Sequence, residues 1–384
     1  MTEKPIRILH YIKHLESGGG ETLVYNIYKT IDRETIQFDF LVNTERKELL
    51  DDKVAALGGR RLVLMKREPK CTPLKIVLAM TNLYKLLRKG EYKIFHIHCS
   101  NGQGLLYAYI AKRAGVPVCV VHIHNAGVDG RFKIVKRAFH CLCKVLFMKA
   151  PDYYIACSEA AARWLYSDRI VEDKRYLLLK NGIEADRFRY NEGVRYKIRE
   201  RLHINDKKVL LNVGRMQQQK NQKFIIDIYA ELSRTGDNYS LIIIGRGALE
   251  KQLKDYARKK GIYERIHFID YTDRVEDYMC AADIFLLPSF EEGLGIAAIE
   301  AQASGLHTLV SEAVPREAYI SPLVRALPAD KGCREWTTAI TKLGECTNRE
   351  EAVHYIDEAG YGIEKCAAQI SELYLRSISK EHFT

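Results

Sequence analysis

Short apolar runs alternate with amphipathic stretches along the whole chain. In the first half, runs typical of buried strands are separated by stretches whose apolar residues recur at helical spacing. We expect strands over residues 6–12, 38–42, 94–98, 118–122, 153–157 and 176–179. We expect helices over residues 22–31, 74–88, 105–114, 131–149 and 159–165. Strands this apolar, each followed by a helix, indicate a parallel sheet that helices cover on both faces.

The second half of the chain repeats this alternation. Strands are expected over residues 209–213, 241–244, 266–269, 284–287 and 308–310, and helices over 223–232, 249–260, 274–281 and 296–303. Two such blocks predict an α/β protein with two doubly wound, Rossmann-like domains. The turn signal Lys180-Asn181-Gly182 separates them. We therefore expect domains over residues 1–182 and 183–362, with a charged connection at 190–208.

Length and composition agree with this organisation. The chain has 384 residues, of which 47% are hydrophobic and 28% charged, as in globular proteins. No run approaches the ~18 apolar residues of a membrane span, and the N-terminus lacks the apolar core of a signal peptide. We therefore expect a cytoplasmic protein. Its ten cysteines are scattered without zinc-binding spacing, so we expect reduced thiols.

Positive charge is concentrated in the first half. Residues 1–180 carry 31 Lys and Arg against 18 Asp and Glu, whereas residues 181–384 carry 29 against 31. Residues 131–149 hold six basic and no acidic side chains, interleaved with a helical stripe of Val135, Phe139, Leu142 and Leu146. Such a helix suits an anionic membrane surface, and the alternative is an ordinary helix whose stripe faces the core. Nucleic acid is disfavoured because no nucleic-acid-binding motif accompanies the charge.

Two loops that follow predicted strands combine glycine or cations with a helix start. Ligands of open parallel sheets bind at the carboxyl ends of strands. Ser17-Gly18-Gly19-Gly20-Glu21 follows the first strand, and its glycines let the backbone approach an anion. Arg215 and Lys220 follow strand 209–213, and such a pair suits a diphosphate. A flexible turn and two ordinary surface cations are the alternatives.

A third loop, residues 288–295, follows strand 284–287 and opens the next helix. It contains Glu292, and its glycines leave backbone N–H groups for a phosphate. Glu300 follows in an otherwise small and apolar segment, where a carboxylate needs polar partners. Ribose hydroxyls would serve, and so would a neighbouring cation or water.

The spacing of Glu292 and Glu300 resembles the Glu-x7-Glu motif of retaining glycosyltransferases of family 4. These enzymes have the GT-B fold, in which two Rossmann-like domains face each other across a cleft. The resemblance covers nearly the whole chain. The matching motifs, in the family's order, are the Gly-rich first loop, Asn181-Gly182-Ile183, Gly214-Arg215 with Lys220, Gly245-Arg246-Gly247 and residues 288–301. Val314-Pro315-Arg316-Glu317 resembles the bacterial exopolysaccharide and capsule branch.

The resemblance implies a nucleotide-sugar site in the second domain. Arg215 and Lys220 would hold the diphosphate and stabilise the leaving group, Glu300 would bind the ribose and Glu292 the donor sugar. The remaining implied contacts are Gly293, Leu294 and Gly295 with sugar or phosphate, Ile269, Asp270 and Tyr271 with the base, and Gly19 and Gly20 with the diphosphate.

His124 matches the family's active-site histidine, near the reacting sugar. There it would orient a hydroxyl group or carry a proton. His98 is a candidate for the acceptor site. A metal bound by these residues together with His96 and His122 is the competing idea, but no acidic partner accompanies them and the chain has no Asp-x-Asp motif. We therefore expect neither a metal nor a cofactor.

The resemblance implies a metal-independent, retaining transfer of a sugar from a nucleotide-sugar, with a uridine nucleotide (UDP) as the first expectation and a guanosine nucleotide as the fallback. The expected acceptor is a lipid-linked surface polysaccharide at the inner face of the membrane. A site built from cations favours departure and attack on the same face of the sugar. The last helix, about residues 363–384, is expected to cross back to the first domain. Two alternatives stay open: transfer to a small soluble acceptor, and a non-catalytic nucleotide- or sugar-binding protein.

Overall fold

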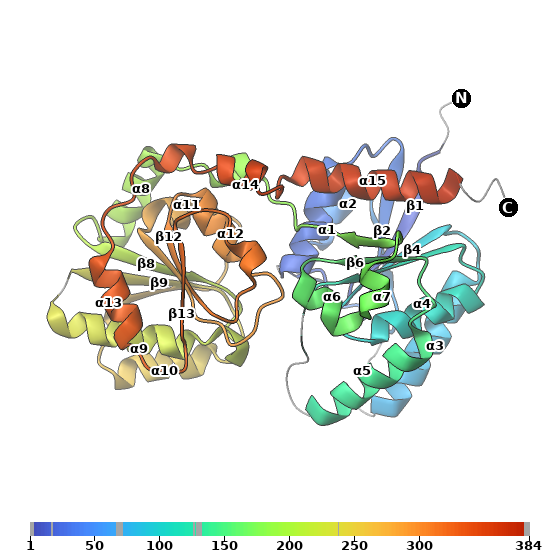
Figure 1. Ribbon diagram of the computed structural model, residues 1–384, viewed down its shortest axis with the longest axis horizontal. Coiled ribbons are helices and arrows are strands. Elements are labelled where there is room, and N and C mark those ends of the chain that lie inside the picture. The colour runs from blue at the N-terminus through green and yellow to red at the C-terminus, as the bar shows by residue number, and fades with distance from the viewer. Residues whose placement is uncertain are drawn as a thin grey trace. The chain divides into compact units, whose positions relative to one another are not determined.

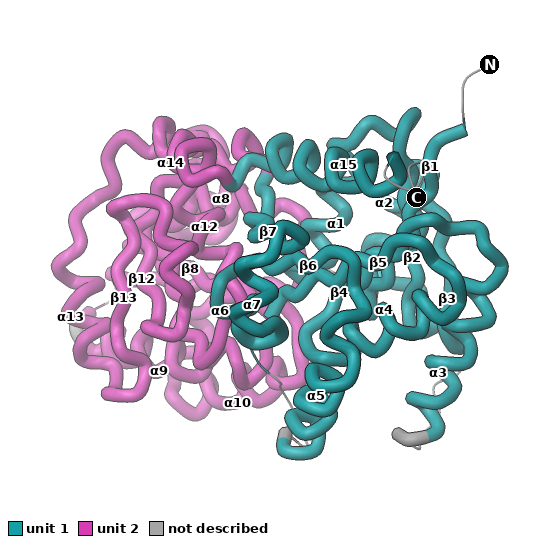
Figure 2. The backbone as a smooth tube through the Cα atoms, turned by 45° about the vertical axis from the view of Figure 1, so that its right-hand side comes forward, with its two compact units in different colours: residues 1–183, 361–384 teal, residues 184–360 magenta. Residues whose placement is uncertain are grey.

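The computed structural model describes residues 4–16, 18–66, 72–125, 127, 133–236 and 238–379. The chain forms two compact units (Figures 1 and 2): unit 1 is Met1–Ile183 with Tyr361–Thr384, and unit 2 is Glu184–Gly360. The sequence led us to expect limits at 182/183, from the turn at Asn181-Gly182, and at 362, before the last helix. Ser17 of the first loop, residues 131–132 of the basic stretch and residues 380–384 of the last helix lie outside the described residues.

Unit 1 is built on a seven-stranded parallel sheet in the order β3-β2-β1-β4-β5-β6-β7. All strands run the same way, but the order in which the chain adds them reverses between β1 and β4. Its strands are β1 (Ile6–Tyr11), β2 (Ile36–Val42), β3 (Arg60–Val63), β4 (Ile94–Cys99), β5 (Val118–Ile123), β6 (Tyr153–Ala156) and β7 (Tyr176–Leu178). Its helices are α1 (Gly19–Thr30), α2 (Asp51–Ala56), α3 (Thr72–Leu87), α4 (Gln103–Arg113), α5 (Lys133–Phe147), α6 (Glu159–Leu165), α7 (Asp168–Val171) and α15 (Ile363–Ser379). Helices α1, α2 and α15 cover one face, and α3 to α6 cover the other.

Unit 2 is built on a six-stranded parallel sheet in the order β10-β9-β8-β11-β12-β13, which reverses between β8 and β11. Its strands are β8 (Lys208–Val213), β9 (Tyr239–Ile244), β10 (Ile266–Ile269), β11 (Ile284–Leu287), β12 (His307–Ser311) and β13 (Val324–Leu327). Its α-helices are α8 (Glu192–Leu202), α9 (Gln222–Leu232), α10 (Glu250–Lys259), α11 (Val275–Ala281), α12 (Ile296–Ala303), α13 (Arg334–Lys342) and α14 (His354–Glu358). The prediction of two doubly wound parallel sheets is confirmed.

The C-terminal helix α15 is part of the core of unit 1 (Figure 2). Its buried side chains Ile363, Ile370 and Tyr374 pack with residues of α1 and β2. The two chain segments that join the units run side by side, because the N–H of Ile183 donates to the carbonyl of Tyr361 at 2.7 Å and the N–H of Ile363 donates to that of Ile183 at 3.1 Å. Gly182 permits this approach, since a Cβ there would lie 2.8 Å from the Cα of Ile363.

Several elements were not expected from the sequence pattern. The edge strands β3 and β13 are only partly buried, so neither shows a continuous apolar run. The stretch 190–208 was expected as a charged connection, but it forms α8. Caps rather than apolar periodicity define this helix: the Asn191 side chain accepts from the N–H of Val194, and His203 ends the helix in a left-handed conformation. Helix α1 begins at Gly19 instead of Thr22.

The nine described cysteines are free thiols, five of them buried. Among the described residues, no helix combines the length and the apolar character needed to cross a membrane.

Candidate functional site

The predicted cations and carboxylate of unit 2 lie where its strand order reverses. Lys220 ends the 3-10 turn Gln218–Lys220 after β8, and Glu292 lies in the loop after the neighbouring β11. The Lys220 ammonium lies 2.6 Å from Oε1 of Glu292, and the Ser289 hydroxyl donates to the same oxygen at 2.6 Å. Because Glu292 is only 7% exposed, this is a largely buried ion pair at the carboxyl ends of two strands.

The loops after β8 and β11 are held together as one unit. The N–H of Phe290 donates to the carbonyl of Gln219 at 2.8 Å, and the side-chain amide of Asn221 donates to the carbonyl of Pro288 at 3.1 Å. The sequence did not predict these contacts, because Gln219 and Asn221 are uncharged and the other partners are backbone groups. Their effect is to fix Lys220 and Glu292 relative to each other.

Arg215 is exposed and directly follows Gly214 at the end of β8. The predicted turn at Gly245-Arg246-Gly247 packs against this segment so closely that side chains would not fit. A Cβ on Gly247 would lie 2.3 Å from the carbonyl oxygen of Met216, and the N–H of Met216 donates to the carbonyl of Arg246 at 2.9 Å. The backbone next to Arg215 is thereby fixed by the turn after β9.

The glycines of the third loop open helix α12 as predicted. Gly295 is the N-cap of α12 and has a φ of 88°, in the left-handed region that favours glycine. Gly293 and Leu294 are buried beside it. The first amides of a helix have no partner within it, so this loop presents backbone N–H groups at the same sheet edge as Lys220.

Glu300 lies in the second half of α12 (Ile296–Ala303). Burial raises the pKa of its carboxyl to about 7, an effect that Arg187 opposes and the negative charge of Glu276 reinforces. Arg187 is already engaged, since its guanidinium lies 2.9 Å from the Glu276 carboxylate. Within the described residues, the Glu300 carboxylate has no hydrogen-bond partner. Sequence reasoning did not identify Arg187, which lies in a different chain segment.

Ile269 ends β10 at the edge of the sheet, and Asp270 and Tyr271 follow it. The backbone joins this end to β9, because the N–H of Gly245 donates to the carbonyl of Ile269 at 2.9 Å. Asp270 is exposed and lies 3.7 Å from the ammonium of Lys254, and the Arg246 guanidinium lies 5.9 Å from the Tyr271 ring centre. These residues occupy the same end of the sheet as Lys220, two strands from β8.

In unit 1, the predicted glycines and His124 meet beside the corresponding reversal of strand order, which lies between β1 and β4. Gly19 and Gly20 form the first turn of α1 after β1, and His124 directly follows β5. Gly20 packs on the imidazole of His124, since a Cβ there would lie 3.3 Å from the ring's Cγ. The helix start and the histidine are therefore direct neighbours.

Five histidines gather on one face of this sheet. His10 on β1, His96 and His98 on β4, and His122 and His124 at the end of β5 line up across neighbouring strands. Burial lowers the pKa of every one, to about 3 for His10 and about 4 for His124, so all five imidazoles are neutral at physiological pH. His10 had no sequence signal except its place at the end of the first strand.

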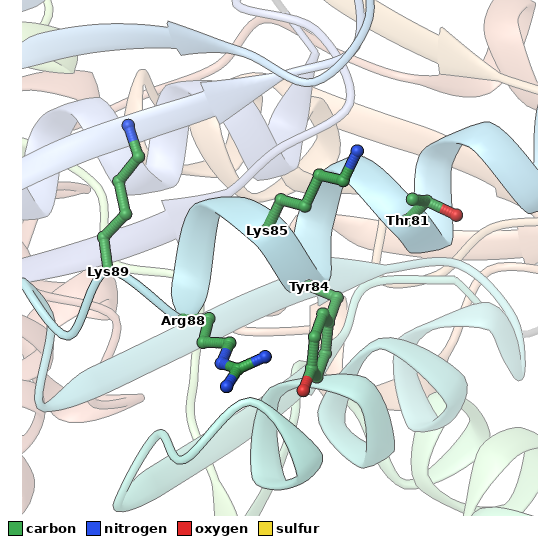
Figure 3. A pocket seen from close by; sticks show the side chains of 5 residues that line it. All are labelled: Thr81, Tyr84, Lys85, Arg88 and Lys89. Atoms are coloured by element: carbon green, nitrogen blue, oxygen red, sulfur yellow. The ribbon is translucent and has the colours of Figure 1, made fainter.

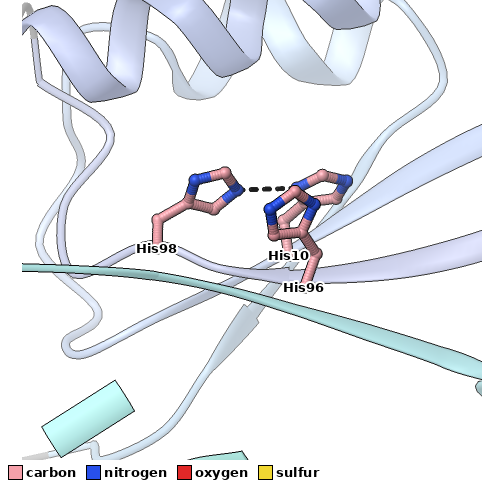
Figure 4. A group of neighbouring side chains, drawn as sticks. All are labelled: His10, His96 and His98. Atoms are coloured by element: carbon pink, nitrogen blue, oxygen red, sulfur yellow. Dashed lines mark hydrogen bonds between the residues drawn. The ribbon is translucent and has the colours of Figure 1, made fainter. Parts of the chain in front are cut away.

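The histidines are also the group best placed to hold a metal ion. In each of two sets, His10 with His96 and His98 (Figure 4), and His98 with His122 and His124, the ring nitrogens lie within 4.8 Å of one another. Neutral imidazoles are the form that metals bind. The expectation of no metal was based on the missing acidic partner and stays a prediction.

A shallow hollow of about 460 Å³ lies on α3, apart from these strand ends (Figure 3). Its lining is Thr81, Tyr84, Lys85, Arg88 and Lys89. It contains none of the predicted site residues.

The chain matches two protein-family models. Residues 17–187 match the family described as Glycosyltransferase Family 4, and residues 194–361 match the family described as Glycosyl transferases group 1. These two matches follow the two units closely.

Two curated relatives illustrate the similarity. The chain is 28% identical over its full length to EpsF of Bacillus subtilis, a proposed glycosyltransferase that it also covers completely. It is 28% identical over 62% of both chains to the UDP-Gal:alpha-D-GlcNAc-diphosphoundecaprenol alpha-1,3-galactosyltransferase of Escherichia coli.

Among solved structures, HepE of Anabaena in complex with UDP and glucose has a TM-score of 0.77, with 16% identity over 96% of this chain and 99% of HepE. This likeness concerns the fold. Together with the family matches, it shows that the chain is a GT-B enzyme and belongs to the glycosyltransferases of the family 4 and group 1 type.

Proposed function

We propose that this glycosyltransferase transfers a sugar, with retention of anomeric configuration, from a UDP-sugar to a lipid-linked glycan at a membrane surface. The observation that carries the proposal is the Lys220–Glu292 pair at the strand reversal of unit 2, where Arg215 also follows β8. UDP is supported by the UDP-glucose complex of HepE and by the UDP-Gal in the name of the Escherichia coli relative. The lipid-linked acceptor is supported by the diphosphoundecaprenol in that same name.

In the proposed site, cations and backbone amides receive the diphosphate. The ammonium of Lys220 leaves its pairing with Glu292 in part and faces the phosphate oxygens, together with Arg215 and the N–H groups at the start of α12. Glu292 then accepts hydrogen bonds from hydroxyl groups of the donor sugar. Glu300 accepts hydrogen bonds from the ribose hydroxyls, which would give its partly buried carboxylate polar partners.

Retention through same-face attack agrees with this set of groups. Glu292 is occupied by Lys220 and Ser289 on one oxygen, an arrangement that suits sugar binding better than attack at the anomeric carbon. Cations that stabilise the departing diphosphate leave its oxygen free to accept the acceptor's proton. This chemistry needs no metal and no cofactor. A covalent sugar–enzyme adduct, detected by mass spectrometry of the intact chain, would contradict it.

Helix α5 supports contact with an anionic membrane. The predicted stripe does not face the core: Val135, Leu142 and Leu146 are 66%, 55% and 59% exposed, while only Phe139 packs partly on it. Ile134 and Val145 add exposed fractions of 85% and 82%. Exposed apolar residues beside basic ones are what an interfacial helix presents to lipid.

Helix α3 adds to the same kind of surface. It and α5 both pack against α4 (Figure 1). Leu74, Val77 and Leu78 of α3 are 50%, 58% and 36% exposed, and Lys85, Arg88 and Lys89 follow them at its C-terminal end (Figure 3). The apolar side chains suit contact with lipid acyl chains, and the cations beside them suit contact with anionic headgroups.

Replacement of Lys220 by Ala tests the donor site. We expect UDP to raise the unfolding temperature of the wild-type chain more than GDP or ADP does, and Lys220→Ala to lower UDP-sugar turnover by about 100-fold or more. Lys223→Ala, three residues away on α9, is the matched control and should leave turnover unchanged. Equal turnover in all three proteins would refute the site, and a preference for GDP would refute the donor.

A further inference from the structure

Three of the five histidines form a hydrogen-bonded row that ends at His124. Nδ1 of His10 lies 3.0 Å from Nε2 of His98, and Nδ1 of His98 lies 2.9 Å from Nε2 of His124. The first of these contacts is visible in Figure 4. At the other end of the row, the Tyr374 hydroxyl of α15 lies 3.4 Å from Nε2 of His10 and 2.5 Å from Nδ1 of His96. The row thus joins α15 to the residue beside the start of α1.

The ring orientations favour this row over a metal centre. Ligands of one metal ion must aim their in-plane lone pairs at a common point. The His10 and His98 rings are nearly parallel, at 13°, and His96 stacks on His98 with ring centres 4.3 Å apart and an angle of 18°. The in-plane lone pairs of the stacked His96 and His98 rings lie in two separate, nearly parallel planes, so these two rings do not aim at one ion.

We infer the direction of each hydrogen bond from the contact to Tyr374 and from the number of protons that each group carries. An O–H donor makes bonds of about 2.5–3.0 Å, whereas an N–H donor needs about 2.7–3.2 Å to an oxygen. The 2.5 Å contact therefore has the Tyr374 hydroxyl donating to Nδ1 of His96. The second contact of the tyrosine oxygen, with Nε2 of His10, is longer at 3.4 Å, and because the hydroxyl has no second proton, its oxygen can only accept there.

This direction carries along the row because a neutral imidazole has one N–H. With its proton on Nε2, His10 accepts at Nδ1 from Nε2–H of His98. His98 then accepts at Nδ1 from Nε2–H of His124. Nδ1 of His124 is left with a lone pair and is buried with no partner among the described residues.

We propose that Tyr374, His10 and His98 are positioning residues that hold His124 as its Nε2–H tautomer, so that its Nδ1 accepts a hydrogen bond from a sugar hydroxyl group. Gly20 on one side, and the His122 ring at 4.0 Å, keep the imidazole in place. The sugar as partner of Nδ1 rests on the proposed function, whereas the tautomer does not.

The tautomer is tested by ¹⁵N NMR of the full chain with labelled histidine and no ligand, since the shifts of Nδ1 and Nε2 report which nitrogen carries the proton. We expect His124 to carry its proton on Nε2 in the wild type and to populate both tautomers in Tyr374→Phe. The deleted hydroxyl contacts His10, and His124 lies two hydrogen bonds further along the row. Tyr28→Phe, which removes a hydroxyl from another buried tyrosine of the same core, should leave His124 unchanged. A wild-type His124 with its proton on Nδ1, or one unaffected by Tyr374→Phe, would overturn the proposal.

Kinetics with a UDP-sugar supply an independent readout. Tyr374→Phe should lower kcat about tenfold and leave the donor KM within about twofold, because a wrong tautomer impairs the reaction more than binding. Should that variant fail to fold, His10→Asn and His10→Phe replace it: the Asn amide takes the place of Nδ1 and keeps the link to His98, and Phe does not. Equal kcat values for the two His10 variants would contradict the row.

The two proposals fail separately. A chain that turns over no UDP-sugar, but shows the expected ¹⁵N shifts, refutes the proposed function and retains the tautomer row. Purified full chain carrying about one zinc ion that is lost in His98→Asn would make the histidines metal ligands and refute the row.

Discussion

At the scale of single residues, the fold sets the charge state of Glu300 and the ion-pair partner of Lys220. Glu300 was recognised from its apolar sequence neighbours and its spacing from Glu292. The structure adds Arg187 and Glu276, which come from other segments and set the charge around it. Lys220 and Glu292 were both predicted as site residues, but the sequence did not show that they form an ion pair with each other.

Replacement of Glu300 by Gln should change how stability depends on pH. Burial raises the pKa of Glu300 from 4.5 to about 7, so between these values the folded chain holds a proton that the unfolded chain has lost. The free energy of unfolding therefore falls as pH rises through this window. We expect the free energy of unfolding of Glu300→Gln to be about 1–2 kcal/mol higher than that of the wild type at pH 8, and about the same at pH 5.

Urea unfolding of the full chain at the two pH values measures this difference. Glu312→Gln, at an exposed position of the same unit, is the control and should follow the wild type. Parallel pH profiles for wild type and Glu300→Gln would show that the pKa of Glu300 is not raised in the folded chain.

At the scale of elements, the site depends on backbone turns that pack too closely for side chains. The turn at Gly245-Arg246-Gly247 fixes the segment that carries Arg215, and the loop after β11 fixes Lys220 through Gln219 and Asn221. The sequence marks the glycines, but which backbone each one approaches depends on strand order.

Gly247→Ala should destabilise unit 2 by about 1–3 kcal/mol, because its Cβ would lie 2.3 Å from the carbonyl oxygen of Met216. Gly344→Ala is the matched control: its Cβ would meet nothing within 4 Å, and neither glycine has a positive φ. Chemical denaturation compares the two. Equal effects would mean that the turn yields without cost.

Helix α5 is the element through which we expect membrane binding. Ile134→Ser combined with Val145→Ser should weaken binding to anionic vesicles about tenfold or more, and leave the unfolding temperature unchanged because both side chains already face water. Tyr196→Ser, at a 61% exposed position of α8, is the control for loss of an exposed apolar residue. Co-sedimentation that does not distinguish the variants would remove α5 from the membrane contact.

At the scale of the whole molecule, chain order and structural units differ. The last segment belongs to unit 1, although unit 2 precedes it in the sequence. Tyr374 of α15 reaches the histidine row, so the C-terminal end of the chain takes part in the site of the N-terminal unit.

A chain that ends at Gly360 should therefore lose the fold of unit 1 and keep that of unit 2. Burial of Ile363, Ile370 and Tyr374 contributes about 1.5–3 kcal/mol per side chain, which approaches the ~5–15 kcal/mol stability of a whole domain. Hydrogen exchange should show protection lost in residues 4–183 and retained in 184–360. Retained protection in unit 1 would show that α15 is dispensable.

The sequence by itself determined the alternation of strands and helices, the turn between the units and the glycosyltransferase motifs. These are local signals, since apolar periodicity and turn residues act on neighbouring positions. It did not reveal the edge strands or α8, whose positions are fixed by pairing and capping. Nor did it join His10, His98 and His124 to Tyr374. Only the tertiary structure decided that row, because β1, β4, β5 and α15 meet through long-range packing that no local pattern encodes.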